Sequence, residues 1–208
     1  MANARPTSAR DAFAAAVGCF LATSAEIGDG WWESPATDLW TVGQLFAHVV
    51  RGMAVMSDYL DADPTPPDAV LGGAAAYFRA ALDTDGVHEG IADRAVAAAS
   101  AAGPDRSAWA REVGDAAIRR AAETGDDRVL VHFAGAIRFG DYLETRITEV
   151  VLHTFDLQVA CGLEVAAPAD ALAITNGVLL DLVDRADPAG LALALSGRPG
   201  HLACNVLG

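Results

Sequence analysis

The sequence predicts a mainly all-α protein, an up-and-down helical bundle followed by a short C-terminal β-hairpin. Hydrophobic residues make up 52% of the chain, far above what a disordered chain carries. Alanine-rich stretches with apolar residues at helical spacing follow one another, separated by Gly, Pro and Asp. A chain of 21.5 kDa is long enough for one domain with a full core. We expect a bundle domain over residues 1–186 and a tail, residues 187–208, packed on it.

Capping and breaking residues bound the first two helices. A helix is predicted over Ser8–Ile27, where apolar residues recur on one face, and the Gly-Asp-Gly run that follows ends it. Thr41 and Gln44 form the pattern of a capping box, so a second helix is predicted over Val42–Ala62. The proline-rich segment 63–67 ends this second helix.

The rest of the chain continues the helical pattern, with two exceptions. Further helices are predicted over Ala69–Leu82, Val87–Ala102, Asp105–Thr124, Tyr142–Cys161 and Pro168–Ala186. Asp141 is expected to cap the fourth of these, with Glu144 at its third position. Arg128–Ala134 is rich in β-branched and aromatic residues, which predicts a short strand or an extended lead-in. Gly190–Ser196 and His201–Leu207 are apolar segments around a Gly-Arg-Pro-Gly turn, which predicts the hairpin.

The charge pattern excludes several classes of protein. Lys plus Arg is 14 and Asp plus Glu is 28, a net charge of −14, and every basic residue is Arg. The lack of lysine excludes a Schiff-base lysine and a P-loop lysine. The acidic balance, without a basic tract, argues against nucleic-acid or anionic-membrane partners. The longest stretch free of charge, Ala12–Ala25, is 14 residues, too short to span a bilayer at about 20.

The first helix and the cysteines predict a cytoplasmic protein. Two arginines before the first apolar run resemble the start of a signal peptide, but Asp11 interrupts it and the spacing favours an amphipathic helix. Cys19, Cys161 and Cys204 are odd in number and widely spaced. We interpret them as reduced, buried cysteines.

The predicted helix after Asp141 carries a stripe of ionisable residues. Arg146, Glu149, His153 and Asp156 recur three and four residues apart, so they lie on one face of an otherwise apolar helix. Such a helix is expected to be largely buried, and buried ionisable groups are paired or bind a metal. Glu149 and His153, one turn apart, are within reach of a shared ion.

The second helix offers a third metal ligand. His48 lies on the apolar face of that helix, and Gly52, one turn later, leaves room for a close neighbour. Two histidines and one carboxylate form a set that catalytic zinc sites use, with a fourth position open. Asp156 is expected to accept the ring N–H of a ligand histidine. Arg146 is expected to pair either with Glu149 or with a substrate carboxylate.

The same residues also have purely structural interpretations. His48 alone is compatible with a hydrogen-bonded core histidine, and Glu149 with His153 is compatible with a solvated ion pair. We interpret His132 as an ordinary strand residue. The three tryptophans near Pro35 are interpreted as a core plug under a loop rather than a ligand cage.

Two segments resemble a known family. Trp32–Arg51 resembles the "W…P…GWTVRDLVAHL" opening of the mycothiol-dependent maleylpyruvate isomerase N-terminal domain, and Gly140–Ala160 is similar to its "DYLxTRxxExxxHxxDLAxA" helix. The resemblance implies a DinB-like up-and-down four-helix bundle with extra short helices. It also implies a divalent metal, most often zinc, bound by His48, Glu149 and His153.

The resemblance further implies an enzyme. It would use zinc, with nickel or iron as alternatives, and mycothiol as the thiol cosubstrate, for S-transfer to a small electrophile or for cis–trans isomerisation. Arg146 and Asp156 are the expected catalytic residues. Full-length members have a C-terminal domain that supplies a catalytic arginine, for which Arg198 and Arg146 are the candidate substitutes here. The thiol and the electrophile are the expected partners, and a homodimer is an option.

Three other functions remain open from the residues. Two histidines and a carboxylate also suit a non-haem Fe(II) oxygenase. A non-catalytic, metal-stabilised binding or sensor protein would hold the metal without binding a thiol. A purely structural helical dimer would hold no metal at all.

Overall fold

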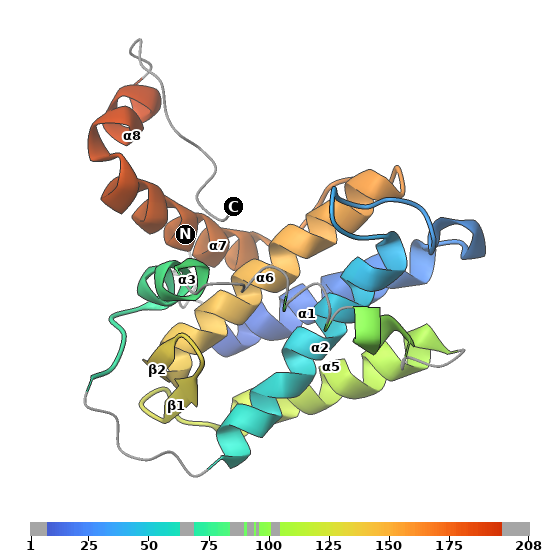
Figure 1. Ribbon diagram of the computed structural model, residues 1–208, viewed down its shortest axis with the longest axis horizontal. Helices are drawn as coiled ribbons and strands as arrows, with labels where there is room; N and C mark the ends of the chain where they lie inside the picture. Colours follow the sequence, from blue (N-terminus) through green and yellow to red (C-terminus); the bar gives the residue numbers. More distant parts are fainter. Residues whose placement is uncertain are drawn as a thin grey trace, which may run out of the picture.

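The computed structural model describes residues 8–62, 69–83, 90, 94, 96–100 and 105–196. Its centre is a bundle of the helices α1 (Ala9–Glu26), α2 (Val42–Asp61), α5 (Arg106–Glu123) and α6 (Phe139–Ala160). Helix α1 packs against α5 and α6, and α2 packs against the same two helices (Figure 1). The predicted fold class, a mainly helical bundle, is confirmed.

Smaller elements surround this bundle. They are the 3-10 turn η1 (Asp29–Trp31), α3 (Ala74–Leu82), β1 (Val129–His132), β2 (Gly135–Arg138), α7 (Ala169–Ala186) and α8 (Pro188–Leu195). The strands β1 and β2 pair antiparallel, with His132 opposite Gly135, which confirms the strand predicted in this part of the chain. Helix α7 lies against α6, and α8 extends away from the bundle beyond α7 (Figure 1).

Apolar side chains from the central helices fill the bundle interior. Phe13, Val17 and Phe20 of α1 are fully buried, and Phe20 stacks on Phe46 of α2 with ring centroids 5.5 Å apart. Helix α5 approaches α1 closely at Gly114, where an added Cβ would lie 2.9 Å from a methyl group of Val17. This packing fixes the relative rotation of the helices, and with it the faces that meet at the site described below.

The capping box predicted at the start of α2 is confirmed, and Ser8, at the predicted start of the first helix, also caps α1. The Ser8 side chain accepts from the Asp11 N–H at 3.2 Å. Thr41 and Gln44 form the complete capping box, with bonds of 3.3 and 3.0 Å. Helix α6 ends at Ala160 with Cys161 as its C-cap, and the following Gly162 has a φ of +66°, in the left-handed region that favours glycine.

The start of α6 differs from the prediction. The helix begins at Phe139, and Asp141 lies in its first turn rather than at the cap. Loop carbonyls take the place of a side-chain cap: the Phe139 N–H donates to Arg128 at 2.7 Å and the Gly140 N–H donates to Asp126 at 3.1 Å. Asp141 therefore makes no cap bond, and its carboxylate in the first turn interacts favourably with the helix dipole.

The predicted C-terminal hairpin is wrong in its first arm, because α8 occupies that segment as a helix. Asp187 caps α8 by accepting from the Gly190 N–H at 2.9 Å, and Pro188 stands at the first helical position. The Leu-Ala alternation fits a strand or a helix, so this local cap favours the helix. The second arm, His201–Leu207, lies outside the described residues, as do Arg198 and Cys204.

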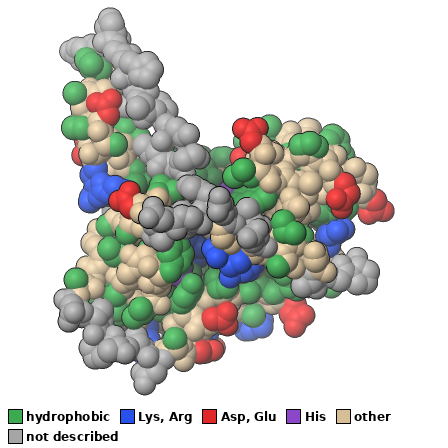
Figure 2. Space-filling view, viewed as in Figure 1, with side chains coloured by type: hydrophobic (Ala, Val, Ile, Leu, Met, Phe, Trp, Pro, Cys, Tyr) green, Lys and Arg blue, Asp and Glu red, His purple; other side chains and the backbone are tan. Residues whose placement is uncertain are grey.

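Most of the helix predicted over Val87–Ala102 also lies outside the described residues. Of that segment, residues 90, 94 and 96–100 are described, and they are helical. Cys161 is buried and Cys19 is partly exposed, and both are free thiols. No helix in the described ranges is long and apolar enough to cross a membrane. Figure 2 shows acidic side chains scattered mainly along the edges of one face, with a group of arginine side chains near its middle.

Candidate metal centre

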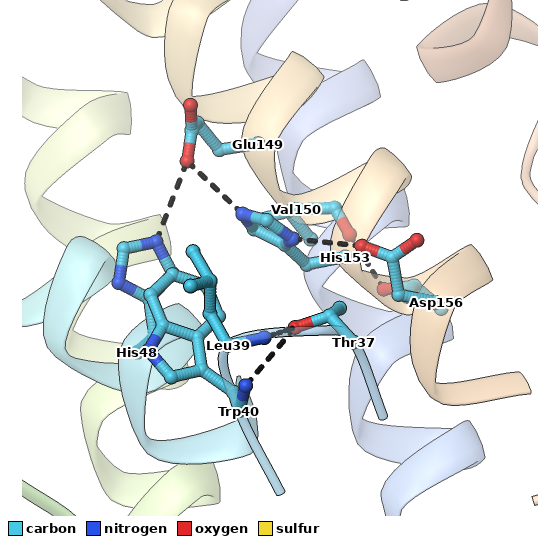
Figure 3. Close-up of polar contacts among 9 residues, drawn as sticks. Thr37, Leu39, Trp40, His48, Glu149, Val150, His153 and Asp156 are labelled. Atoms are coloured by element: carbon cyan, nitrogen blue, oxygen red, sulfur yellow. Dashed lines mark hydrogen bonds and ion pairs between the residues drawn. The ribbon is translucent and has the colours of Figure 1, made fainter. Parts of the chain in front are cut away.

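Three side chains from two helices converge at one point between α2 and α6 (Figure 3). His48 comes from α2, and Glu149 and His153 come from successive turns of α6. Glu149 Oε2 lies 3.6 Å from Nε2 of His48 and 3.4 Å from Nε2 of His153. One ligand atom from each residue lies within 4.8 Å of the other two. The structure therefore brings together the three residues that the sequence singled out as ligands.

The spacing of these atoms fits a divalent transition metal. Ligand atoms about 2.0–2.1 Å from a tetrahedral zinc lie about 3.4 Å apart, close to the two measured separations. Imidazole nitrogen and carboxylate oxygen are ligands that zinc, iron and nickel all accept. The three side chains are 17%, 30% and 22% exposed for His48, Glu149 and His153. They are thus partly buried and still reachable from solvent.

The packing of α6 explains why its polar stripe faces α2. Leu143, Ile147 and Leu157 on the other sides of α6 are fully buried in the core. With those sides packed, the face that carries Glu149 and His153 is left to meet α2. The two imidazoles meet nearly at right angles, with ring centroids 5.1 Å apart.

Asp156 orients one of the two histidines. Its Oδ2 lies 3.0 Å from Nδ1 of His153, one turn earlier on α6. When the Nδ1–H donates to this carboxylate, the lone pair of Nε2 points toward Glu149. Carboxylates in this position fix the tautomer and the orientation of metal-binding histidines.

The electrostatics of the three residues favour a cation between them. Burial lowers the pKa of His48, and its contact with Glu149 only partly offsets this. Burial alone would also lower the pKa of His153, but hydrogen bonds to Asp156 and Glu149 raise that pKa to about 9. Burial alone would raise the pKa of Glu149, yet the two histidines and Arg146 hold it well below its usual range. Glu149 is therefore ionised and attracts positive charge, either a proton on His153 or a metal ion.

Arg146 lies one turn before Glu149 on α6. Its Nε–H donates to Thr145 Oγ1 at 3.2 Å, and its guanidinium carbon lies 5.0 Å from the ring centroid of Tyr142. The ion pairs of Glu149 within the described residues are with the two histidines. Of the two partners expected for Arg146, the ion pair with Glu149 is therefore not formed in this part of the chain.

A small pocket opens beside the three converging residues. It is lined by His48, Val49, Gly52 and Met53 of α2 and by Arg146, Glu149, Val150 and His153 of α6. A Cβ added at Gly52 would lie 3.7 Å from Nη1 of Arg146, so Gly52 does leave room for a close neighbour. The space inside the pocket is about that of one water molecule, and the pocket is partly open to solvent. It thus has room for an ion.

Comparison with known proteins places the chain in a family. The family model described as the mycothiol maleylpyruvate isomerase N-terminal domain matches residues 13–158, a range that contains all three converging residues. The chain belongs to this family. No match was found among curated proteins or solved structures.

The prediction of a core plug near Pro35 holds for two of the three tryptophans. Trp32 and Trp40 both pack against the hydrophobic core, Trp32 edge-on to Phe46, whereas Trp31 is exposed. The sequence analysis missed that the Trp40 indole also stacks on the His48 ring, with centroids 4.7 Å apart. The signal was its position directly before Thr41, the cap of α2, which places the indole beside the first turns of the helix that carries His48.

Side chains from α2, α3, β1 and α6 form a second polar cluster. We call it the tyrosine–histidine cluster; it consists of Tyr59, Tyr77, His132 and Tyr142. The Tyr77 hydroxyl lies 3.0 Å from Nδ1 of His132, and the Tyr59 ring centroid lies 4.6 Å from that of His132. Burial, and next to it the charge of Arg146, lowers the pKa of His132 to about 3. His132 is on a strand, as predicted, but it is also the centre of this cluster, which the sequence did not reveal.

Proposed function

We propose that this family member is a divalent-metal-dependent enzyme that uses a low-molecular-weight thiol of the mycothiol type. The reaction is either S-transfer to a small electrophile or its cis–trans isomerisation. The observation that carries the proposal is the convergence of His48, Glu149 and His153 beside a small pocket that is partly open to solvent. The choice of thiol rests on the family name alone.

The chain's own residues would divide the work as follows. His48, Glu149 and His153 would hold the metal, most simply zinc, and Asp156 would keep His153 in the metal-binding tautomer. When bound, the metal supplies the positive charge that lowers the pKa of a thiol and makes thiolate available at neutral pH. Arg146, a cation lining the same pocket, would face the negative charge of the substrate.

Both reactions begin with the same addition of the thiolate to the substrate. The thiolate sulfur adds to one carbon of an electrophilic double bond, so that a C–S bond forms and the π electron pair moves onto the substrate beside Arg146. In S-transfer, a proton from solvent then completes the product. In isomerisation, rotation about the former double bond comes first. The electron pair held on the substrate then re-forms the double bond as the C–S bond breaks, and the thiolate leaves with the electron pair of the C–S bond.

The test begins with the metal content of protein purified without added metal, for the wild type and His48→Ala in parallel. We expect near-stoichiometric metal in the wild type, its loss in the variant, and binding of mycothiol to the metal-loaded wild type by calorimetry. A wild type that holds metal but binds no thiol would support the metal-stabilised binding or sensor protein instead. A wild type that takes up no zinc, nickel or iron would overturn the proposal.

Related expectations belong to the same proposal. The partners would be the thiol and a small electrophile rather than nucleic acid or a membrane. The location would be the cytoplasm, in keeping with the free thiols of Cys19 and Cys161. Residues 1–186 would form the metal-binding domain, and a homodimer is one option for its assembly.

A further inference from the structure

The three converging residues have two differently built faces. One face is covered by Trp40, whose indole stacks on the His48 ring at 4.7 Å and meets the His153 ring edge-on at 6.0 Å. Figure 3 shows Trp40 on the side of the two imidazoles away from Glu149. The other face borders the pocket, which Gly52 and Arg146 line and Trp40 does not.

The backbone around Trp40 fixes the position of its indole. The Trp40 N–H donates to Oγ1 of Thr37 at 3.1 Å. Its carbonyl accepts from the N–H groups of Ala36 and Thr37, at 2.9 and 3.1 Å. The next residue, Thr41, forms the capping box of α2. These bonds fix the backbone of Trp40, and the ring contacts with His48 and His153 place its indole against the two histidines.

The pocket face owes its opening to a missing side chain. Gly52 lies one turn after His48 on α2, and it leaves a gap in which the nearest side-chain atom to an added Cβ is the Arg146 guanidinium, at 3.7 Å. An alanine methyl would make an ordinary contact there, whereas a branched side chain would fill the space. The remaining apolar lining residues, Val49, Met53 and Val150, are buried.

We propose that Trp40 is a positioning residue that closes one face of the centre and fixes the His48 ring, so that an outside ligand enters only across Gly52, beside Arg146. Gly52 then limits the size of that ligand, and the Arg146 charge favours small anions such as a thiolate or a carboxylate. The inference rests on the proposed metal centre, and it adds the side from which the ligand binds and the residues that decide it.

Cobalt(II) and N-acetylcysteine provide a test that does not depend on activity. Bound cobalt gives visible absorption bands that report its coordination, and a bound thiolate adds a sulfur-to-cobalt charge-transfer band. Gly52→Val should keep the cobalt bands but bind N-acetylcysteine at least about tenfold more weakly than the wild type, because the added side chain overfills the entry. Gly177→Val, at a helical glycine of α7 with open space around it, is the matched control and should behave as wild type.

Trp40 is tested by a second set of variants. Trp40→Ala should change the cobalt bands and speed cobalt release by about tenfold or more, the scale of losing a group that orients a ligand. Trp40→Phe, which keeps a stacked ring, should largely restore both. Trp31→Ala, which removes a partly exposed indole elsewhere, should change neither. The double variant Gly52→Val with Trp40→Ala should regain thiol binding through the newly opened face.

The outcomes separate this inference from the proposed function. A wild type that takes up no cobalt would overturn both. A wild type that binds cobalt and thiol, with Gly52→Val binding the thiol equally well, would overturn the entry route alone. Cobalt bands and release rates that are unchanged in Trp40→Ala would overturn the role of Trp40. If Trp40→Ala does not fold, the comparison of Gly52→Val with Gly177→Val still decides the entry route.

Discussion

Two clusters of side chains each surround a partly buried histidine, and they shift its pKa in opposite directions. At the candidate metal centre, His153 faces the carboxylates of Glu149 and Asp156, which raise its pKa to about 9. In the tyrosine–histidine cluster, His132 lies among phenol rings, and its pKa falls to about 3. Burial lowers the pKa of both imidazoles, so the difference comes from the carboxylates beside His153 and from the positive charge of Arg146 near His132.

The contrast shows what a histidine needs, besides burial, to take part in a metal site. A ligand set needs anionic or lone-pair donors that converge, and in the described part of the chain three such donors meet at His48, Glu149 and His153. The phenols of Tyr77 and Tyr142 stay protonated, because burial raises the pKa of both. A neutral imidazole is the form that binds a metal, so what His132 lacks, among the described residues, is a converging set of carboxylate or histidine donors.

Arg146 links the two groups. It follows Tyr142 by four residues and precedes Glu149 by three, so its positive charge acts on both sides. The same charge helps to lower the pKa of His132 and of Glu149. One guanidinium therefore favours a neutral histidine on one side and an ionised glutamate on the other.

The largest expected effect is on metal retention, when one histidine in each cluster is replaced by glutamine. His153→Gln should abolish stoichiometric metal retention, because it removes one of three ligands and the amide replaces it poorly. His132→Gln should keep the metal. Elemental analysis of both purified variants measures this, and equal metal content in the two would remove the distinction between the groups.

A smaller effect is expected for the carboxylate that orients His153. Asp156→Asn should weaken metal affinity by about 10- to 100-fold, since the amide no longer carries the charge that holds the Nδ1 proton. Asp141→Asn, on the first turn of the same helix, serves as the control and should leave the affinity unchanged. Competition with a chelating dye measures both affinities, and a wild-type value for Asp156→Asn would show that the 3.0 Å contact has no role in binding.

The smallest effect concerns stability in acid. The pKa of His132 is lower in the folded state than the ordinary value of 6.5, so the unfolded chain binds more protons between pH 6.5 and about 3. Folding stability that depends on neutral His132 is therefore complete above pH 6.5 and is lost as the pH falls through this window, by at most about 1.4 kcal/mol per pH unit.

The check is urea denaturation of metal-free wild type and His132→Phe between pH 7 and 4.5. Phenylalanine does not titrate, so the unfolding free energy of His132→Phe should fall less steeply with decreasing pH than that of the wild type. Glu149 contributes to the acid loss in the same direction, because its pKa is also lowered, and it does so in both proteins. Parallel pH profiles would mean that His132 is not held neutral by its surroundings.

Local signals allowed most helix boundaries to be predicted. The capping box at Thr41 and Gln44 acts within four residues, so it can be recognised without knowledge of the fold. The prediction failed where a helix boundary depends on atoms far away in the sequence, or where a segment carries both a strand pattern and a helix cap. The α6 start at Phe139 depends on loop carbonyls, and in α8 the alternation of Leu and Ala obscured the cap at Asp187.

The sequence by itself determined that Glu149 and His153 share one face of a helix, because the geometry of an α-helix fixes residues four apart. It also indicated His48, on the apolar face of an earlier helix. Only the tertiary structure decided that Nε2 of His48 lies 3.6 Å from Glu149, that Trp40 covers one side of the pair of imidazoles, and that His132 is neutral. These features depend on which helix faces meet. The packing of apolar side chains over the whole core decides which faces meet, and no local sequence pattern encodes it.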